Sequence, residues 1–377
     1  MALNINADTV FAELLLGLTT LVQEESRWAD RYPPGLIQAM NALALGMGDQ
    51  FPATFTAFVA LCHKPLHTWY PYKLSDFTEK YALLDSGQLT EQASDYLYSL
   101  PDEILRQHDW RGFIPTSVRD NWEMLRFLQD MRGMENTAEA QRLYAIIRSF
   151  LIVHSWITRR DLIQLGRQNV SEEIRNWLKS TFYESDDSGD EAYYCDHCGI
   201  LRQVNGRLVG VKPSYCDDHH PDLPHIHKIA TDGYTRMKYG IHLRTFIPGR
   251  TELAIFEAAE SLQAEYADHL IDVARYPGLD AYDLRLVFRD EAWAVDVKDL
   301  ADPRELSRKI QPMPDSKGLE HDKAYYVVPD RRLRFEPDYL DQVRRHHKIK
   351  PPLFLYSQSE FCQHMRAKCV QLVKATR

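Results

Sequence analysis

The chain has 377 residues and a formal net charge of −9; 44% of its residues are hydrophobic and 26% are charged. These values are typical of a globular protein with two or three domains, and they exclude a strongly basic nucleic-acid binder. No run of about 20 apolar residues occurs, so we expect no membrane-spanning segment. Three of the six cysteines cluster and three are scattered, which does not indicate a disulfide framework and predicts a cytoplasmic protein.

Residues 1–183 predict a mostly helical domain. Apolar residues recur there at the spacing of amphipathic helices, the first of which begins at Asn6-Ala7-Asp8. The region carries no catalytic motif, so we expect it to bind a partner or a substrate. Further helices are predicted at Leu36–Met47, Leu74–Leu84, Thr90–Leu97, Val118–Met131, Ala138–Ile157 and Ser171–Phe182.

The segment 184–191 is acidic and contains no apolar residue. This composition favours a solvated linker, and its carboxylates would repel phosphate. We therefore place the first domain boundary here, and expect a zinc-binding module with a connector over 192–249.

Two short cysteine motifs follow the linker. A C-x2-C pair and a C-x2-H pair are separated by a predicted hairpin with Asn205-Gly206 at its turn. Zinc prefers four tetrahedral thiolate and imidazole ligands, which two such motifs would supply. We assign a structural zinc ion to Cys195, Cys198, Cys216 and His219. His220 is the alternative fourth ligand, and His225 and His227 are more remote substitutes.

The connector Lys228–Arg250 is relatively basic and contains aromatic residues. It could follow a nucleic-acid backbone, or it could be a connector strand with a solvated face.

A helix is predicted at Thr251–Leu270, with Thr251 as its N-cap, and a strand at Ile271–Tyr276. Glu252 falls within the apolar stripe of this helix. It is either a carboxylate that faces the sheet near a metal ion, or an acid in the first turn that complements the helix dipole.

A β-hairpin is predicted over Asp283–Lys298, because apolar residues alternate on both sides of the charged pair Arg289-Asp290. If this pair forms the loop, Asp283 lies opposite Asp296, with Cβ atoms about 5 Å apart. Two such carboxylates repel each other unless a cation lies between them, and Mg²⁺ prefers oxygen ligands. Lys298 follows Asp296 by two residues and therefore points to the same face of the strand.

This Asp…Asp-x-Lys pattern resembles the PD-(D/E)xK superfamily of restriction-endonuclease-like nucleases. The resemblance implies that Asp283, Asp296 and the Val297 carbonyl hold Mg²⁺ or Mn²⁺. It further implies that Lys298 acts on the attacking water and the phosphate, and that Glu252 assists.

Two positions qualify the resemblance. Tyr282 stands where the family has a proline before the first aspartate. Asp280 is the alternative to Asp283 as the first acidic metal ligand. The implied fold over 250–377 is a restriction-endonuclease-like α/β sandwich with a mixed sheet.

The elements after the hairpin fit that fold, with a helix predicted at Asp302–Ile310 and strands at Ala324–Val328 and Pro352–Tyr356. A helix is also predicted near Pro337–His347. We expect a nucleic-acid patch at Arg331, Arg332, Arg344, Arg345 and Lys348. Helix capping alone would explain Arg344 and Arg345.

The complete order of helical domain, acidic linker, zinc module and nuclease domain resembles the nuclease found beside prokaryotic PIWI-RE proteins and a helicase in defence islands. The resemblance implies a metal-dependent DNA endonuclease in anti-phage or anti-plasmid defence. Its expected partners are DNA, a helicase and a PIWI-type protein, and a homodimer is compatible with it. The alternative is a catalytically inactive, zinc-stabilised adaptor that docks these partners onto nucleic acid. A zinc-dependent transcription factor has no recognition helix or basic arm to support it.

Overall fold

The computed structural model describes residues 6–23, 32–74, 77–85, 87–100, 116–185, 191–204, 206–212, 215–216, 218–229 and 233–376. The chain divides into two compact units. Unit 1 comprises Met1–Arg119 with Leu300–Lys309, and unit 2 comprises Asp120–Asp299 with Ile310–Arg377. Within the described ranges, no helix is both long and apolar enough to cross a membrane.

Unit 1 is mainly helical, as predicted for this part of the sequence. Gly17 lets its first two helices approach closely, since a Cβ there would lie 2.5 Å from the Cβ of Leu36. The short strands β1 (Leu84–Asp85) and β2 (Gln88–Leu89) form an antiparallel pair. The helices are α1 (Ala7–Gln23), α2 (Pro34–Met47), α3 (Phe55–Cys62), α4 (Glu91–Ser99) and α13 (Pro303–Lys309).

The helix predicted at Leu74–Leu84 is wrong for the residues that the structure describes there. Its later part consists of a turn and bends that lead into β1, and the carbonyls of Glu79 and Tyr81 accept hydrogen bonds from the amides of His67 and Leu66, at 2.9 and 3.0 Å. These long-range bonds replace the bonds that a local helix would have made.

The first helices of unit 2 are α6 (Thr116–Arg132), which belongs to this unit from Asp120 onward, α7 (Thr137–Val153), α8 (Arg159–Gly166) and α9 (Glu172–Phe182). Side chains from α6, α7 and α9 are buried in one apolar cluster with residues of the zinc-motif region and of the helix that follows it. The compact boundary therefore lies at 119/120 and differs from the boundary predicted at 184–191.

Small sheets surround the cysteine motifs. Strand β10 (Thr235–Met237) lies between β3 (Trp156–Ile157) and β4 (Tyr183–Ser185), so Glu184 and Ser185 belong to a strand rather than to a linker. Residues 186–190 of the expected linker lie outside the described residues. A second sheet has the order β6 (Gly199–Ile200), β5 (Tyr193–Cys195) and β9 (Ile226–Lys228), and a hairpin joins β7 (Arg202–Val204) to β8 (Arg207–Val209).

The alternative of a connector strand is wrong over 239–250. This stretch is a continuous helical run of α10 (Tyr239–Ile241), a π-helical turn (His242–Phe246) and the start of α11 (Ile247–Glu265). Thr251 is therefore a buried residue inside α11 and not its N-cap.

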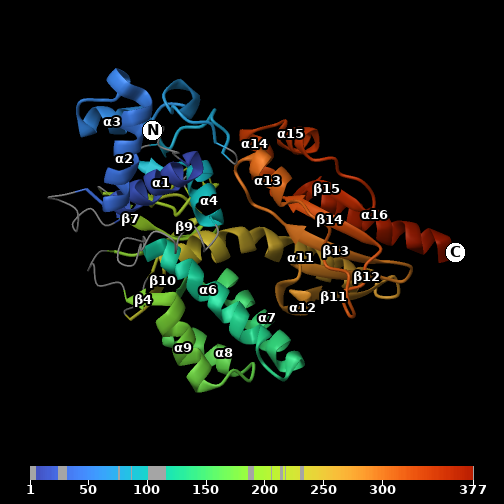
Figure 1. Cartoon of the computed structure of the whole chain (residues 1–377). Coiled ribbons are helices and arrows are strands. Elements are labelled where there is room, and N and C mark those ends of the chain that lie inside the picture. Colours follow the sequence, from blue (N-terminus) through green and yellow to red (C-terminus); the bar gives the residue numbers. More distant parts are fainter. Residues whose placement is uncertain are drawn as a thin grey trace. The chain divides into compact units, whose positions relative to one another are not determined.

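The C-terminal sheet is mixed and has the order β11-β12-β13-β14-β15, as expected (Figure 1). Strands β11 (Leu270–Arg275), β12 (Leu284–Phe288) and β13 (Ala292–Val297) pair antiparallel, and β13, β14 (Lys323–Val328) and β15 (Leu353–Ser357) pair parallel. Helices α11 and α16 (Gln358–Thr376) share one apolar core with the sheet. Shorter helices are α12 (Pro277–Asp280), α14 (Asp330–Phe335) and α15 (Tyr339–His346).

Candidate functional site

The β12–β13 hairpin has the predicted register. Leu284 pairs with Val295 and Val287 with Ala292, and the Phe288 amide donates to the Glu291 carbonyl at 2.8 Å. Two residues therefore form the loop, and the next position of the register places Asp283 opposite Asp296. The sequence predicted this register on the condition of a two-residue loop, and the observed register buries the apolar residues of both strands together.

Asp283 is buried and accepts a 2.6 Å hydrogen bond from the Val297 amide. Burial raises the pKa of its carboxyl group well above the usual range, and the charges of Glu252 and Asp296 raise this pKa further. The protonated form of Asp283 is therefore favoured over its usual range, and a bound cation would favour the carboxylate instead.

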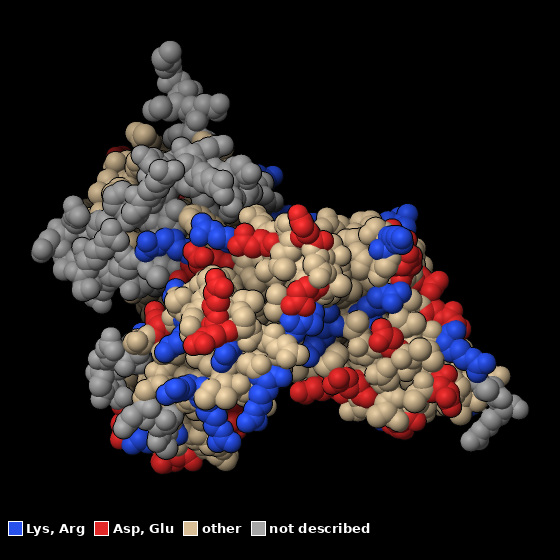
Figure 2. Space-filling model, turned by 90° about the horizontal axis from the view of Figure 1, so that it is seen from below, with Lys and Arg blue, Asp and Glu red and all other residues tan. Residues whose placement is uncertain are grey.

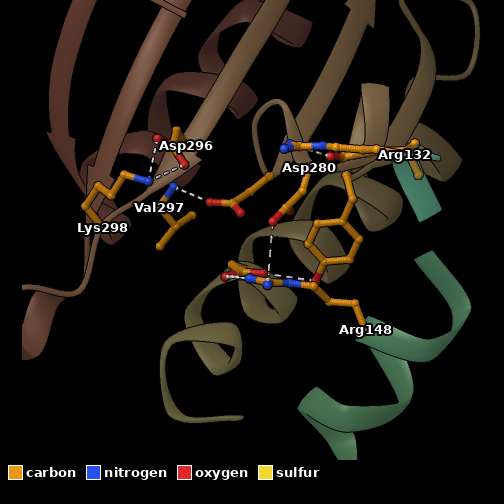
Figure 3. Close-up of polar contacts among 10 residues, drawn as sticks. Arg132, Arg148, Asp280, Asp296, Val297 and Lys298 are labelled. Carbon is orange, nitrogen blue, oxygen red and sulfur yellow. Dashed lines mark hydrogen bonds and ion pairs between the residues drawn. The ribbon is translucent and has the colours of Figure 1, made fainter. Parts of the chain in front are cut away.

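Lys298 approaches Asp296 from the same strand end. Its ammonium lies 2.9 and 2.7 Å from the two carboxylate oxygens of Asp296 (Figure 3). Burial alone would lower the pKa of Lys298, but the charges of Asp296 and Asp283 outweigh burial and raise this pKa. The side chain is therefore an ammonium ion at neutral pH, suited to offset negative charge rather than to accept a proton.

Glu252 is buried and lies well inside α11, so the helix-dipole explanation does not apply to it. Arg148 of α7 donates to one of its carboxylate oxygens at 3.0 Å, and the Tyr276 hydroxyl donates to the other at 2.9 Å. Arg148 also lies 3.7 Å from Asp280 (Figure 3). Burial raises the pKa of Glu252 against the opposing charge of Arg148.

These acids form a site with unbalanced negative charge. The charges of Glu252, Asp296 and Asp280 act on Asp283 against that of Lys298, so four acids share the two cations Lys298 and Arg148. The Oδ1 atom of Asp280 is buried without a hydrogen-bond partner. Oxygen donors crowded in this way fit a hard divalent cation. Among the described residues, however, the carboxylates do not form a group of three at metal-ligand distance.

A buried ion pair anchors the chain directly after Lys298. Both carboxylate oxygens of Asp299 bind guanidinium groups, one from Arg331 and one from Arg332, the latter at 2.8 Å. Burial opposes ionisation, but Arg332 and Arg331 hold the pKa of Asp299 well below its usual range. Arg331 and Arg332 are themselves buried, so the prediction that they form a surface patch for nucleic acid is wrong.

The remaining residues of the expected patch are exposed on and after α15. Arg344 binds Asp341 and Arg345 binds Asp338, each at 3.1 Å. Arg344 and Lys348 line a surface cavity of about 430 Å³ beside strand β15. On the face drawn in Figure 2, basic and acidic side chains are interspersed, in keeping with the net charge of −9.

The structure brings the four predicted zinc ligands together. The ligand atoms of Cys195, Cys198, Cys216 and His219 lie within 4.8 Å of one another, and the four residues could hold a metal ion. A hydrogen bond from Cys198 lowers the pKa of the Cys195 thiol to about 3, and the same bond raises the pKa of Cys198. A cluster that already favours a thiolate suits zinc.

The alternative histidines are engaged elsewhere. His220 is exposed and interacts with Asp222, His225 lies near the Asp218 carbonyl, and His227 binds Asp196 at 2.9 Å. Gly210 belongs to the site although the sequence did not identify it. A Cβ at this position would lie 2.9 Å from the His219 ring and 3.2 Å from the Cys198 sulfur.

Sequence reasoning also missed Arg148, Tyr276 and Tyr326. Tyr326 pairs with Asp296 across parallel strands, and its hydroxyl donates to the Gln311 carbonyl at 3.0 Å. Arg148 lies more than 100 residues before Glu252, and no local pattern links the two. Only the packing of α7 against α11 reveals the contact.

Comparison with known proteins supports the nuclease interpretation of the C-terminal region. Residues 249–371 match the model of a family described as "REase associating with pPIWI_RE", in which REase denotes a restriction endonuclease. No curated protein and no solved structure matches the chain. The resemblance predicted from the sequence is thus confirmed for this region, which includes Glu252, Asp283, Asp296 and Lys298. The cysteine cluster and α7 lie outside the match.

Proposed function

We propose that this restriction-endonuclease-like domain hydrolyses phosphodiester bonds of DNA with the help of Mg²⁺ or Mn²⁺. The observation that carries the proposal is the hairpin register, which places Asp283 opposite Asp296 with Lys298 on the same strand end. The family match and the charge imbalance around Asp283 support it independently.

Asp283, Asp296 and the Val297 carbonyl would hold the metal ion, and Glu252 would assist from α11. When bound, such an ion acidifies water and stabilises charge that develops on phosphate. The ammonium of Lys298 contributes a second positive charge at this place, because its raised pKa keeps it protonated. Asp299 fixes the main chain next to Lys298 through its two buried arginines.

The cysteine cluster would hold a structural zinc ion in this proposal. Its four ligands leave no open coordination position for a substrate, which is typical of structural rather than catalytic sites. The family description further suggests that the chain works beside a pPIWI_RE protein. We accordingly propose a role in defence against foreign DNA, with a PIWI-type protein and a helicase as partners.

The proposal is tested with the full chain and with single- and double-stranded DNA and RNA. Each substrate is incubated with Mg²⁺, with Mn²⁺ or with EDTA. Wild type should cleave DNA only when a divalent ion is present, while Asp283→Asn, Asp296→Asn and Lys298→Met should lose about 10²-fold or more of the rate. Lys350→Met, an exposed lysine outside the site, is the matched control.

Two outcomes would contradict this assignment. Cleavage by Asp296→Asn at the wild-type rate would remove the proposed metal ligand from the reaction. Tight binding of DNA without cleavage, with a divalent ion and the pPIWI_RE partner present, would favour the adaptor. The observation that supports the adaptor alternative is that the Lys298 ammonium contacts both carboxylate oxygens of Asp296.

A further inference from the structure

The turn between β11 and β12 has a strained backbone. Tyr276, Leu279 and Asp280 have φ angles of 52°, 55° and 66°, a region that side chains other than glycine rarely adopt. The Tyr276 amide donates to the Asp283 carbonyl at 2.7 Å and closes the turn. The position of Asp283 is therefore coupled to the conformation of this turn.

Helix α7 holds the turn through Gln141. The side-chain amide of Gln141 donates to the Tyr276 carbonyl at 2.7 Å and accepts from the Leu279 amide, also at 2.7 Å. Arg132 of α6 adds a bond to the Leu279 carbonyl at 3.1 Å (Figure 3). A backbone in the left-handed region persists only where its surroundings compensate, and these bonds do so.

Arg148 lies two helical turns after Gln141 and therefore on the same face of α7. Its guanidinium binds Glu252 and Asp280, and its Cζ atom lies 5.0 Å from the centre of the Tyr276 ring. The Tyr276 hydroxyl donates to the second oxygen of Glu252. One side chain of α7 thus connects the strained turn to the carboxylate of α11.

We propose that Gln141 and Arg148 are positioning residues for the acidic site, which hold Asp283 and Glu252 in place from a helix outside the family-matched residues 249–371. The inference rests on the proposed function. Neither side chain bonds to Asp296 or Lys298, so both act through the turn and through Glu252. The nuclease centre is then completed in cis by α7, and a partner that shifts α7 would alter its activity.

The experiment uses the zinc-loaded full chain and the variants Gln141→Leu, Arg148→Met and Arg148→Lys. Arg142→Gln is the control, because Arg142 neighbours Gln141 on α7 but binds Glu139 and the Gln168 carbonyl instead of the turn. Cleavage gives kcat and KM, and the Mn²⁺ signal in electron paramagnetic resonance gives metal affinity, with Asp296→Asn as the background for other Mn²⁺ sites. Melting temperatures report on folding.

We expect Gln141→Leu and Arg148→Met to weaken Mn²⁺ binding and to lower kcat by about 10–100-fold each, as the loss of partners that orient metal ligands does. KM for DNA should stay within about twofold, and Arg148→Lys should recover part of both losses because it keeps the charge. A purely structural role would lower the melting temperature and the active fraction, but would leave the Mn²⁺ affinity of the folded protein unchanged.

The possible outcomes separate the positioning role of Gln141 and Arg148 from the nuclease proposal. Wild-type Mn²⁺ affinity and kcat in Gln141→Leu and Arg148→Met would overturn this inference and leave the nuclease proposal intact. A wild-type chain that neither cleaves nor binds more Mn²⁺ than Asp296→Asn would overturn both. If Gln141→Leu does not fold, Gln141→Glu replaces it, because glutamate keeps an acceptor for the Leu279 amide and replaces the donor to Tyr276 by a carboxylate oxygen that repels the Tyr276 carbonyl.

Discussion

Replacing Asp299 by asparagine should destabilise unit 2 strongly. The Asp299 side chain is 1% exposed, and those of Arg331 and Arg332 are 6% and 4% exposed, so water cannot replace the lost carboxylate. Removing one partner of a buried ion pair leaves an uncompensated charge and costs about 3–5 kcal/mol. At about 2–4 °C per kcal/mol for a unit of this size, the melting temperature should fall by roughly 10 °C.

The same substitution has a predicted pH dependence. The pKa of Asp299 is held far below the value of about 3.9 expected in the unfolded chain. Its stabilising contribution is therefore fully present above about pH 4, and is lost as the pH falls towards the lowered pKa of the folded state. The stability difference between wild type and Asp299→Asn should be constant from pH 5 to 8 and should shrink below pH 4.

Differential scanning calorimetry over this pH range measures both effects. The control is Asp338→Asn, which removes an exposed partner of Arg345 and should leave the melting temperature nearly unchanged. A melting temperature of Asp299→Asn within about 2 °C of wild type at pH 7, well short of the shift expected from the buried pair, would refute the reasoning. A stability difference between wild type and Asp299→Asn that grows as the pH falls below 4 would also refute it.

Three further predictions concern the metal sites. Cys198→Ser should lose bound zinc and lower the melting temperature of unit 2, as measured by metal analysis and calorimetry; undiminished zinc content would show that the ligand set is wrong. Gly210→Ala should weaken zinc binding, because its Cβ would lie 2.9 Å from the His219 ring. Gly133→Ala is the control and should not weaken it, because a Cβ there has no contact closer than 3.5 Å. Equal zinc affinity in the two variants would contradict the close approach. Mn²⁺ affinity should rise as the pH rises, because Asp283, whose pKa is raised, must release its proton to bind the ion; a flat titration would show that Asp283 is not a ligand.

The sequence determined the local features of both sites. Two apolar alternations around Arg289-Asp290 predicted the hairpin and, on the condition of a two-residue loop, the position of Asp283 opposite Asp296, which the observed register has. The cysteine spacing likewise brought Cys195 and Cys198 to a second pair of ligands across a hairpin. Both are short-range consequences of residue spacing and strand geometry.

Tertiary packing alone decided the environment of these residues. The sequence of a basic segment does not show whether its side chains are exposed or buried. In the folded chain Arg331 and Arg332 form a buried ion pair with Asp299 instead of the expected surface patch. In the same way, Glu252 is a partner of Arg148 only because α7 and α11 pack together. Periodicity along one segment reports which face of that segment is apolar, but it carries no information about which distant charge will lie against it.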